Sequence, residues 1–78
     1  MTIEYKGYEI TPISNQFEDS GEWTVGVSIT KHRGSDSSLK PFSASNTFLT
    51  KEEAVAHSIE FGKKIINGEQ PGVSIHDL

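Results

Sequence analysis

The amino-acid sequence predicts a single α+β domain: three or four antiparallel strands with one C-terminal amphipathic helix packed on one face. Residues 23–30 alternate apolar and small polar side chains, the pattern of a strand buried on one side. Residues 51–67 repeat apolar side chains every three or four positions, the pattern of a helix with one buried face. Because the strands precede the helix, we expect two layers, sheet and helix, around one core.

The length and composition are those of one small folded domain. The chain has 78 residues, no cysteine and a formal net charge of -4. This length suits one domain, 1–78, and the absence of cysteine excludes disulfides and cysteine-ligated metal sites. No apolar run is long enough to span a membrane, and the first residues lack the pattern of a signal peptide. We therefore expect a soluble cytoplasmic protein that does not bind membranes.

The first extended segment is predicted over residues 2–13. Apolar and charged residues alternate on both sides of Lys6-Gly7, where glycine can adopt a positive φ. Two structures fit this pattern, a tight hairpin or one strand bent by a glycine bulge. Pro12 cannot donate to a ladder and so belongs at a strand end or on an edge.

Two further strands are predicted over residues 22–31 and 40–48, separated from their neighbours by the polar segments 14–22 and 31–40, which are predicted loops. The first strand directs its apolar side chains to the core: Trp23, Val25, Val27 and Ile29. The second is rich in serine and directs its apolar side chains to one face: Phe42, Ala44 and Phe48. The opposite parity of both strands is polar and weakly charged, which predicts a sheet face open to water.

The helix predicted over 51–67 has a signal at each end. Thr50 and Glu53 form a capping box, and Asn67-Gly68 supplies the left-handed stop. Its apolar and small side chains are expected to form one stripe that covers the sheet: Ala54, Val55, Ser58, Ile59, Phe61, Gly62, Ile65 and Ile66.

Two parts of the chain lie outside this pattern. The tail 69–78 either packs back through Val73, Ile75 and Leu78 or extends into solvent. Phe17 stands alone in the polar segment 14–22, where we expect it to fold over the core as a lid; the alternative is an exposed contact residue.

Reactive side chains do not recur with the spacing of a catalytic or ligand-binding motif. His32, His57 and His76 fall in a loop, on the polar side of the helix and in the tail, without metal-ligand spacing. The serines lie outside any nucleophile motif, and the glycines form no phosphate-binding loop. The sequence therefore predicts that the protein is not an enzyme and has no catalytic, metal-binding or cofactor-binding residue.

The basic residues around segment 31–40 suggest an alternative function in nucleic-acid binding. The order of elements resembles that of the arm-binding domain of phage-type integrases, in which the sheet contacts DNA and cations hold phosphates. The cations in question here are Lys31, Arg33 and Lys40. The net charge of -4 disfavours phosphate binding. We therefore expect contacts with an unknown protein partner or self-association, with nucleic acid as the alternative.

Four segments resemble a family of small uncharacterised bacterial proteins. They are Tyr5-Lys6-Gly7-Tyr8-Glu9-Ile10-Thr11-Pro12, Trp23-Thr24-Val25, Lys40-Pro41-Phe42-Ser43-Ala44 and Thr50-Lys51-Glu52-Glu53-Ala54. They follow one another as in the family, and the resemblance covers nearly the whole chain. It implies a bacterial cytosolic α+β domain of unknown function and transfers no catalytic residue.

Overall fold

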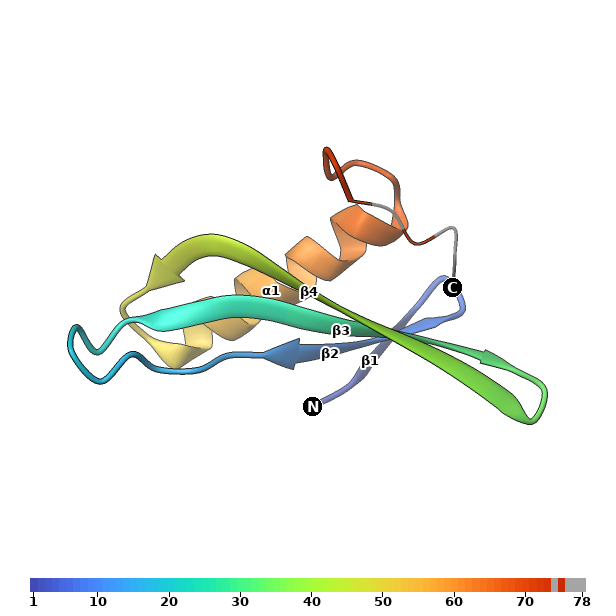
Figure 1. Cartoon of the computed structure of the whole chain (residues 1–78), viewed down its shortest axis with the longest axis horizontal. Helices are drawn as coiled ribbons and strands as arrows, with labels where there is room; N and C mark the ends of the chain where they lie inside the picture. The colour runs from blue at the N-terminus through green and yellow to red at the C-terminus, as the bar shows by residue number, and fades with distance from the viewer. Residues whose placement is uncertain (74, 76–78) are drawn as a thin grey trace.

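The chain forms two layers, a four-stranded antiparallel sheet and one helix that packs on one side of it (Figure 1). The computed structural model describes residues 1–73 and 75. The strands lie in the order β1-β2-β3-β4, so that each pairs with its neighbour in sequence. The elements are β1 (Ile3–Tyr5), β2 (Tyr8–Ile13), β3 (Trp23–Arg33), β4 (Asp36–Phe48) and α1 (Lys51–Ile66). The predicted α+β class, with its antiparallel sheet and C-terminal helix, is confirmed.

The first extended segment is a hairpin, one of the two structures that its sequence allows. Lys6 and Gly7 have φ values of 51° and 85°, and two successive positive φ values are typical of the tight type I′ turn. β1 pairs with only Tyr8 to Ile10 of β2. At Pro12, therefore, β2 is locally an edge strand, where a missing N–H is tolerated.

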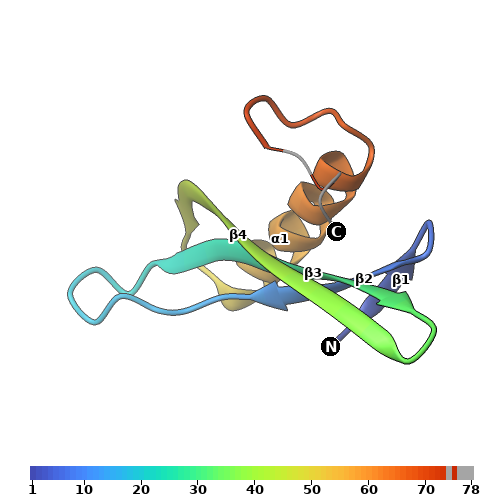
Figure 2. The same ribbon diagram turned by 45° about the vertical axis from the view of Figure 1, so that its right-hand side comes forward.

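Residues 31–40 do not form the predicted loop but continue β3 and β4. The two strands pair as far as Arg33 and Asp36, and Gly34-Ser35 forms the turn between them. We call residues 31–40 the β3–β4 arm; it projects beyond the end of α1 (Figure 2). Its polar composition, which suggested a loop, reflects strands that meet solvent rather than a core.

β4 carries an irregularity opposite Val25. Between the pairs Thr24↔Thr47 and Gly26↔Ser43, β3 has one residue and β4 has three, residues 44–46. In this stretch β4 therefore has two residues more than β3. Because two is an even number, residues of the same parity in β4 point to the same face of the sheet before and after the bulge.

α1 approaches the sheet through a stripe of small residues. Its buried positions are Ala54, Ser58, Gly62 and Ile65. A Cβ atom on Gly62 would lie 2.9 Å from Ile10 Cγ2 and 3.2 Å from Val27 Cγ2. Because Ala54, Ser58 and Gly62 have small side chains or none, the helix backbone comes close to β2 and β3 and encloses the core. The members of that core are Ile10, Val27, Ile29, Ile65 and Ile75.

The apolar residues of α1 form two adjoining faces rather than the single predicted stripe. Val55 and Ile59 are only half-buried, and with Met1 and Ala56 they line a depression at the flank of the helix. Each follows a buried residue by one position, which turns it about 100° around the helix axis. Val55 and Ile59 thus lie at the margin of the predicted stripe rather than in its buried centre, and Val55 lines a depression with Pro12 of β2.

The structure shows where the tail and Phe17 lie, which the sequence left open. Val73 packs against the core and Ile75 is only 9% exposed, so this part of the tail packs back; Leu78 lies outside the described residues. Phe17 is 51% exposed, so the expected lid does not form. Its backbone instead bonds within its own loop, where its N–H donates to the Glu22 carbonyl at 2.8 Å.

Ser58 joins the helix to the central strand by two hydrogen bonds. Its hydroxyl donates to the Ala54 carbonyl at 2.7 Å, and its Oγ accepts from the Gly26 N–H at 3.2 Å. Gly26 adjoins the bulge, and Ser58 itself is 0% exposed. This serine thus satisfies a buried backbone donor that would otherwise face an apolar helix.

We expect Gly62→Ala to destabilise the protein, although alanine is ordinarily the better helix former by about 1 kcal/mol. The new methyl group would press on Ile10 and Val27, and overpacking of a core typically costs about 1–3 kcal/mol. The measurement is the free energy of unfolding in urea, with the exposed Glu60→Ala as a control that stays within about 0.5 kcal/mol. A Gly62→Ala variant more stable than the wild type would contradict this packing.

We expect Ser58→Ala to lower the free energy of unfolding by about 1–3 kcal/mol, because it leaves the buried Gly26 N–H without an acceptor. Ser45→Ala, at an exposed position of the bulge, should change it by less than about 0.5 kcal/mol. Equal effects in thermal or urea unfolding would show that the Ser58–Gly26 bond contributes nothing.

Candidate functional site

α1 covers one face of the sheet and leaves the opposite face open. Three cross-strand rows form the middle of this open face, each with one residue from β2, β3 and β4. We call these residues the open sheet face: Glu9, Thr11, Ile13, Gly26, Ser28, Thr30, Leu39, Pro41 and Ser43. Successive side chains of a strand point to opposite faces of a sheet, and the alternate residues of these strands form the core. The residues of the open sheet face therefore point away from α1.

Apolar side chains stand out from this face. Leu39 is 62% and Ile13 is 41% exposed, and Pro41 between them is exposed as well. Hydroxyl groups and one glycine fill most of the remaining positions, and Glu9 is the only charged member. A surface with several exposed apolar side chains and little charge is typical of a protein-contact surface.

A depression lies over Gly26, where β3 has no side chain and β4 bulges. Its volume is about 520 Å³, and Ile13, Pro41 and Ser43 lie among the residues that line it. An ideal Cβ on Gly26 would lie 3.1 Å from the Ile13 carbonyl oxygen, so the floor is backbone in close approach. The depression is open and partly apolar, a shape that receives a side chain from a partner rather than enclosing a small molecule.

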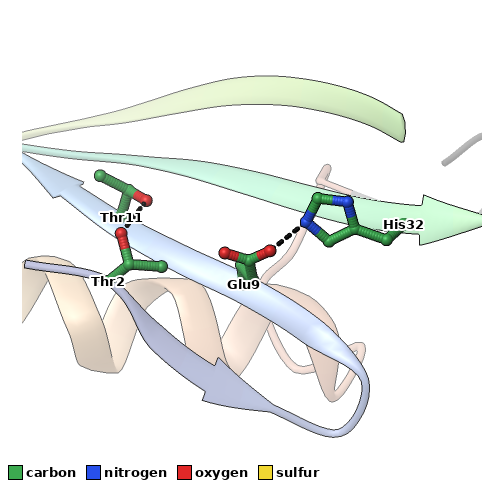
Figure 3. Close-up of polar contacts among 4 residues, drawn as sticks. All are labelled: Thr2, Glu9, Thr11 and His32. Atoms are coloured by element: carbon green, nitrogen blue, oxygen red, sulfur yellow. Dashed lines mark hydrogen bonds and ion pairs between the residues drawn. The ribbon is translucent and has the colours of Figure 1, made fainter. Parts of the chain in front are cut away.

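Polar side chains at the edges of the open sheet face bond to one another (Figure 3). The Glu9 carboxylate on β2 forms a hydrogen bond with the His32 ring near the end of β3, and the Thr2 and Thr11 hydroxyls lie 3.0 Å apart. The Glu9 carboxylate, the single charge of the face, is thus directed toward a neighbouring imidazole. These contacts link β2 to β3 and to the residue that precedes β1, and they do not involve the exposed apolar residues of the face.

The three cations of the nucleic-acid alternative lie on the side of the sheet that carries α1. The Lys31 ammonium lies 4.6 Å from the centre of the Tyr8 ring, and that of Lys40 lies 5.7 Å from the Phe42 ring. Arg33 follows Lys31 by two residues in β3 and therefore shares its face. The structure brings the three residues together on one face of the β3–β4 arm, and none belongs to the open sheet face.

The histidines do not join acidic residues in a group that could bind a metal ion, within the part of the chain that the structure describes. Within residues 1–73 and 75, no group of three or more His, Asp or Glu side chains could hold a metal ion. His57 stacks on Phe48 with ring centres 4.1 Å apart and borders a groove of about 210 Å³ that Glu60, Lys64 and Asn46 also line. The Glu9–His32 pair lies on a flat face, outside the lining of this groove. His76 lies outside the described residues.

Sequence analysis missed Leu39 and Pro41 as surface residues, because both fell in or beside the segment interpreted as a loop. The signal was present in the alternation of residues 38–43, where Lys40 and Phe42 take one parity and Leu39 and Pro41 the other. Their polar neighbours weakened the apolar periodicity that marks a half-buried strand.

The architecture defines a small two-layer α+β domain with one covered and one open sheet face. The chain belongs to the family described as "Domain of unknown function (DUF6566)", whose model matches residues 1–76. No curated protein and no solved structure matches it. Membership in a small uncharacterised family is thus confirmed. Within the described residues, α1 is too short and too polar to be a membrane-spanning helix.

Proposed function

We propose that this domain is a non-enzymatic module that binds another protein through the open sheet face, in the cytoplasm of a bacterium. The observation that carries the proposal is the exposure of Leu39, Ile13 and Pro41 around the depression at Gly26. Burial of apolar surface stabilises a complex by about 25 cal/mol per Å² before the costs of association. The partner that fits is an apolar protein surface that presents one protruding side chain.

The face is a better contact surface than the free edge of β4. That edge carries three features that discourage the addition of a further strand: Lys40, Pro41 and the bulge at residues 44–46. A partner strand would meet a missing N–H at the proline and a broken register at the bulge. Side-chain contacts on the open sheet face have neither obstacle.

We expect Leu39→Glu to reduce partner binding by at least about ten-fold, because it places a charge against an apolar surface. The measurement is quantitative capture of proteins, by the immobilised domain, from a lysate of the cells that produce it. Leu49→Glu is the matched control, since Leu49 is 79% exposed but lies in the connection between β4 and α1. Equal capture by the two variants, or capture of no protein by the wild type, would refute the proposal.

Nucleic-acid association is a second candidate function, favoured by the charge of the β3–β4 arm. Residues 31–40 carry three cations against one acid, whereas the rest of the chain carries four cations against ten acids. Lys31, Arg33 and Lys40 share one face of the arm, where Asp36 pairs opposite Arg33. Phosphate contacts of this kind position a protein without reading sequence.

A gel-shift experiment with mixed DNA and RNA at low salt separates the two functions. We expect no shift, because three cations on an acidic chain give weak phosphate affinity. A shift with the wild type that is lost in the variant Lys31→Ser, Arg33→Ser, Lys40→Ser would replace protein binding by nucleic-acid binding as the function. A shift that persists in this variant would place the contact outside the arm.

A further inference from the structure

The outer side of α1 carries a second apolar surface that neither the core nor the open sheet face uses. Val55 and Ile59 are half-buried, Ala56 is exposed, and with Met1 they line a depression of about 410 Å³. Lys51 lines it as well, but its ammonium lies 5.8 Å from the centre of the Trp23 ring. Glu52 lies at one end of this surface in the first turn of the helix, and Lys63 lies at the other in the last turn. We call these residues the outer helix face: Glu52, Val55, Ala56, Ile59 and Lys63.

The five residues form one stripe along the helix. Their spacing of three or four positions keeps them on one side of a 3.6-residue period. Within the described part of the chain, neither Glu52 nor Lys63 has an ion-pair partner, and the Lys63 ammonium lies 5.6 Å from the centre of the Tyr5 ring. The stripe therefore has an apolar centre between two unpaired charges of opposite sign.

We propose that a second copy of the chain docks on the outer helix face with its α1 antiparallel. In a twofold dimer each contact occurs twice, because residue i meets residue j and residue j meets residue i. If the twofold axis crosses the pair of helices midway between positions 57 and 58, Ala56 lies against the partner's Ile59. The same pairing places Glu52 against the partner's Lys63, so that two ion pairs flank an apolar centre.

Charge complementarity selects this occupant over others. A parallel pair of helices would bring Glu52 to Glu52 and Lys63 to Lys63, and like charges at close range repel. A uniformly acidic or basic partner would match only one end of the stripe. An antiparallel copy of the same stripe satisfies both ends and covers Val55 and Ile59, which the monomer leaves half-exposed.

The first test is a charge exchange, measured as the dissociation constant of the dimer by sedimentation or light scattering over a range of concentrations. Glu52→Lys and Lys63→Glu should each weaken the dimer by about ten-fold, because each creates two like-charged pairs. The double variant Glu52→Lys, Lys63→Glu should restore dimerisation, since the exchanged charges again face opposite signs. Lys64→Glu is the control: it removes a cation from the same last turn, but Lys64 lies off the stripe, beside β4.

The second test uses the absence of cysteine from the chain. Positions 52 and 63 are eleven residues apart in α1, about 16 Å along the helix, too far for a disulfide within one chain. The variant Glu52→Cys, Lys63→Cys should therefore give a disulfide-linked dimer rapidly on oxidation at low protein concentration. Each single variant, whose two cysteines lie about 16 Å apart in the antiparallel pair, should link only slowly through chance collisions. Circular dichroism of each variant shows whether α1 is retained.

A monomeric wild type at millimolar concentration, or failure of the double charge exchange to restore the dimer, would overturn the inference. Cross-linking of a single cysteine variant as fast as that of the double variant would do so as well, because the antiparallel pairing does not bring equal positions together. The inference goes beyond the proposed function and uses a different surface. A monomeric result would thus leave the Leu39→Glu experiment intact, and failure of that experiment would leave the dimer unaffected.

Discussion

The close contact between α1 and the two central strands is the constraint on which the rest of the structure depends. A chain of this size buries a smaller fraction of its surface than a larger domain does, so that its one helix must lie close to the sheet. Ala54, Ser58 and Gly62 permit this approach, and Gly62 has no room for even a methyl group. Ser58 adds a hydrogen bond to Gly26, which satisfies the central strand beside the bulge of β4.

The two candidate binding surfaces follow from that contact. Because the small side chains of α1 face the sheet, the larger Val55 and Ile59 lie at the flank of the helix and stay half-exposed. Because one helix covers one face, the open sheet face remains uncovered and exposes Leu39 and Ile13. We propose the first surface for a second copy of the chain and the second for a different protein. The two surfaces lie on different elements, so that the two proposed contacts do not compete.

Local signals were sufficient for most of the elements. Thr50 caps the helix as its capping box predicted, and its side chain accepts from the Glu53 N–H. The alternation of residues 23–30 identified the central strand, and the buried parity is the apolar one. The sequence predicts a loop for the β3–β4 arm because residues such as Ser and Gly are common in loops. In the structure these residues form a hairpin that is stabilised by strand pairing and faces solvent.

The sequence by itself determined the fold class, the single helix and the parity of the central strand, because periodicity records which residues must avoid water. It did not determine which of two adjoining apolar stripes of α1 meets the sheet. That choice depends on the distance of closest approach, which favours Ala54, Ser58 and Gly62 over the bulkier Val55 and Ile59. The tertiary structure alone decided it, and with it which apolar residues remain available for binding.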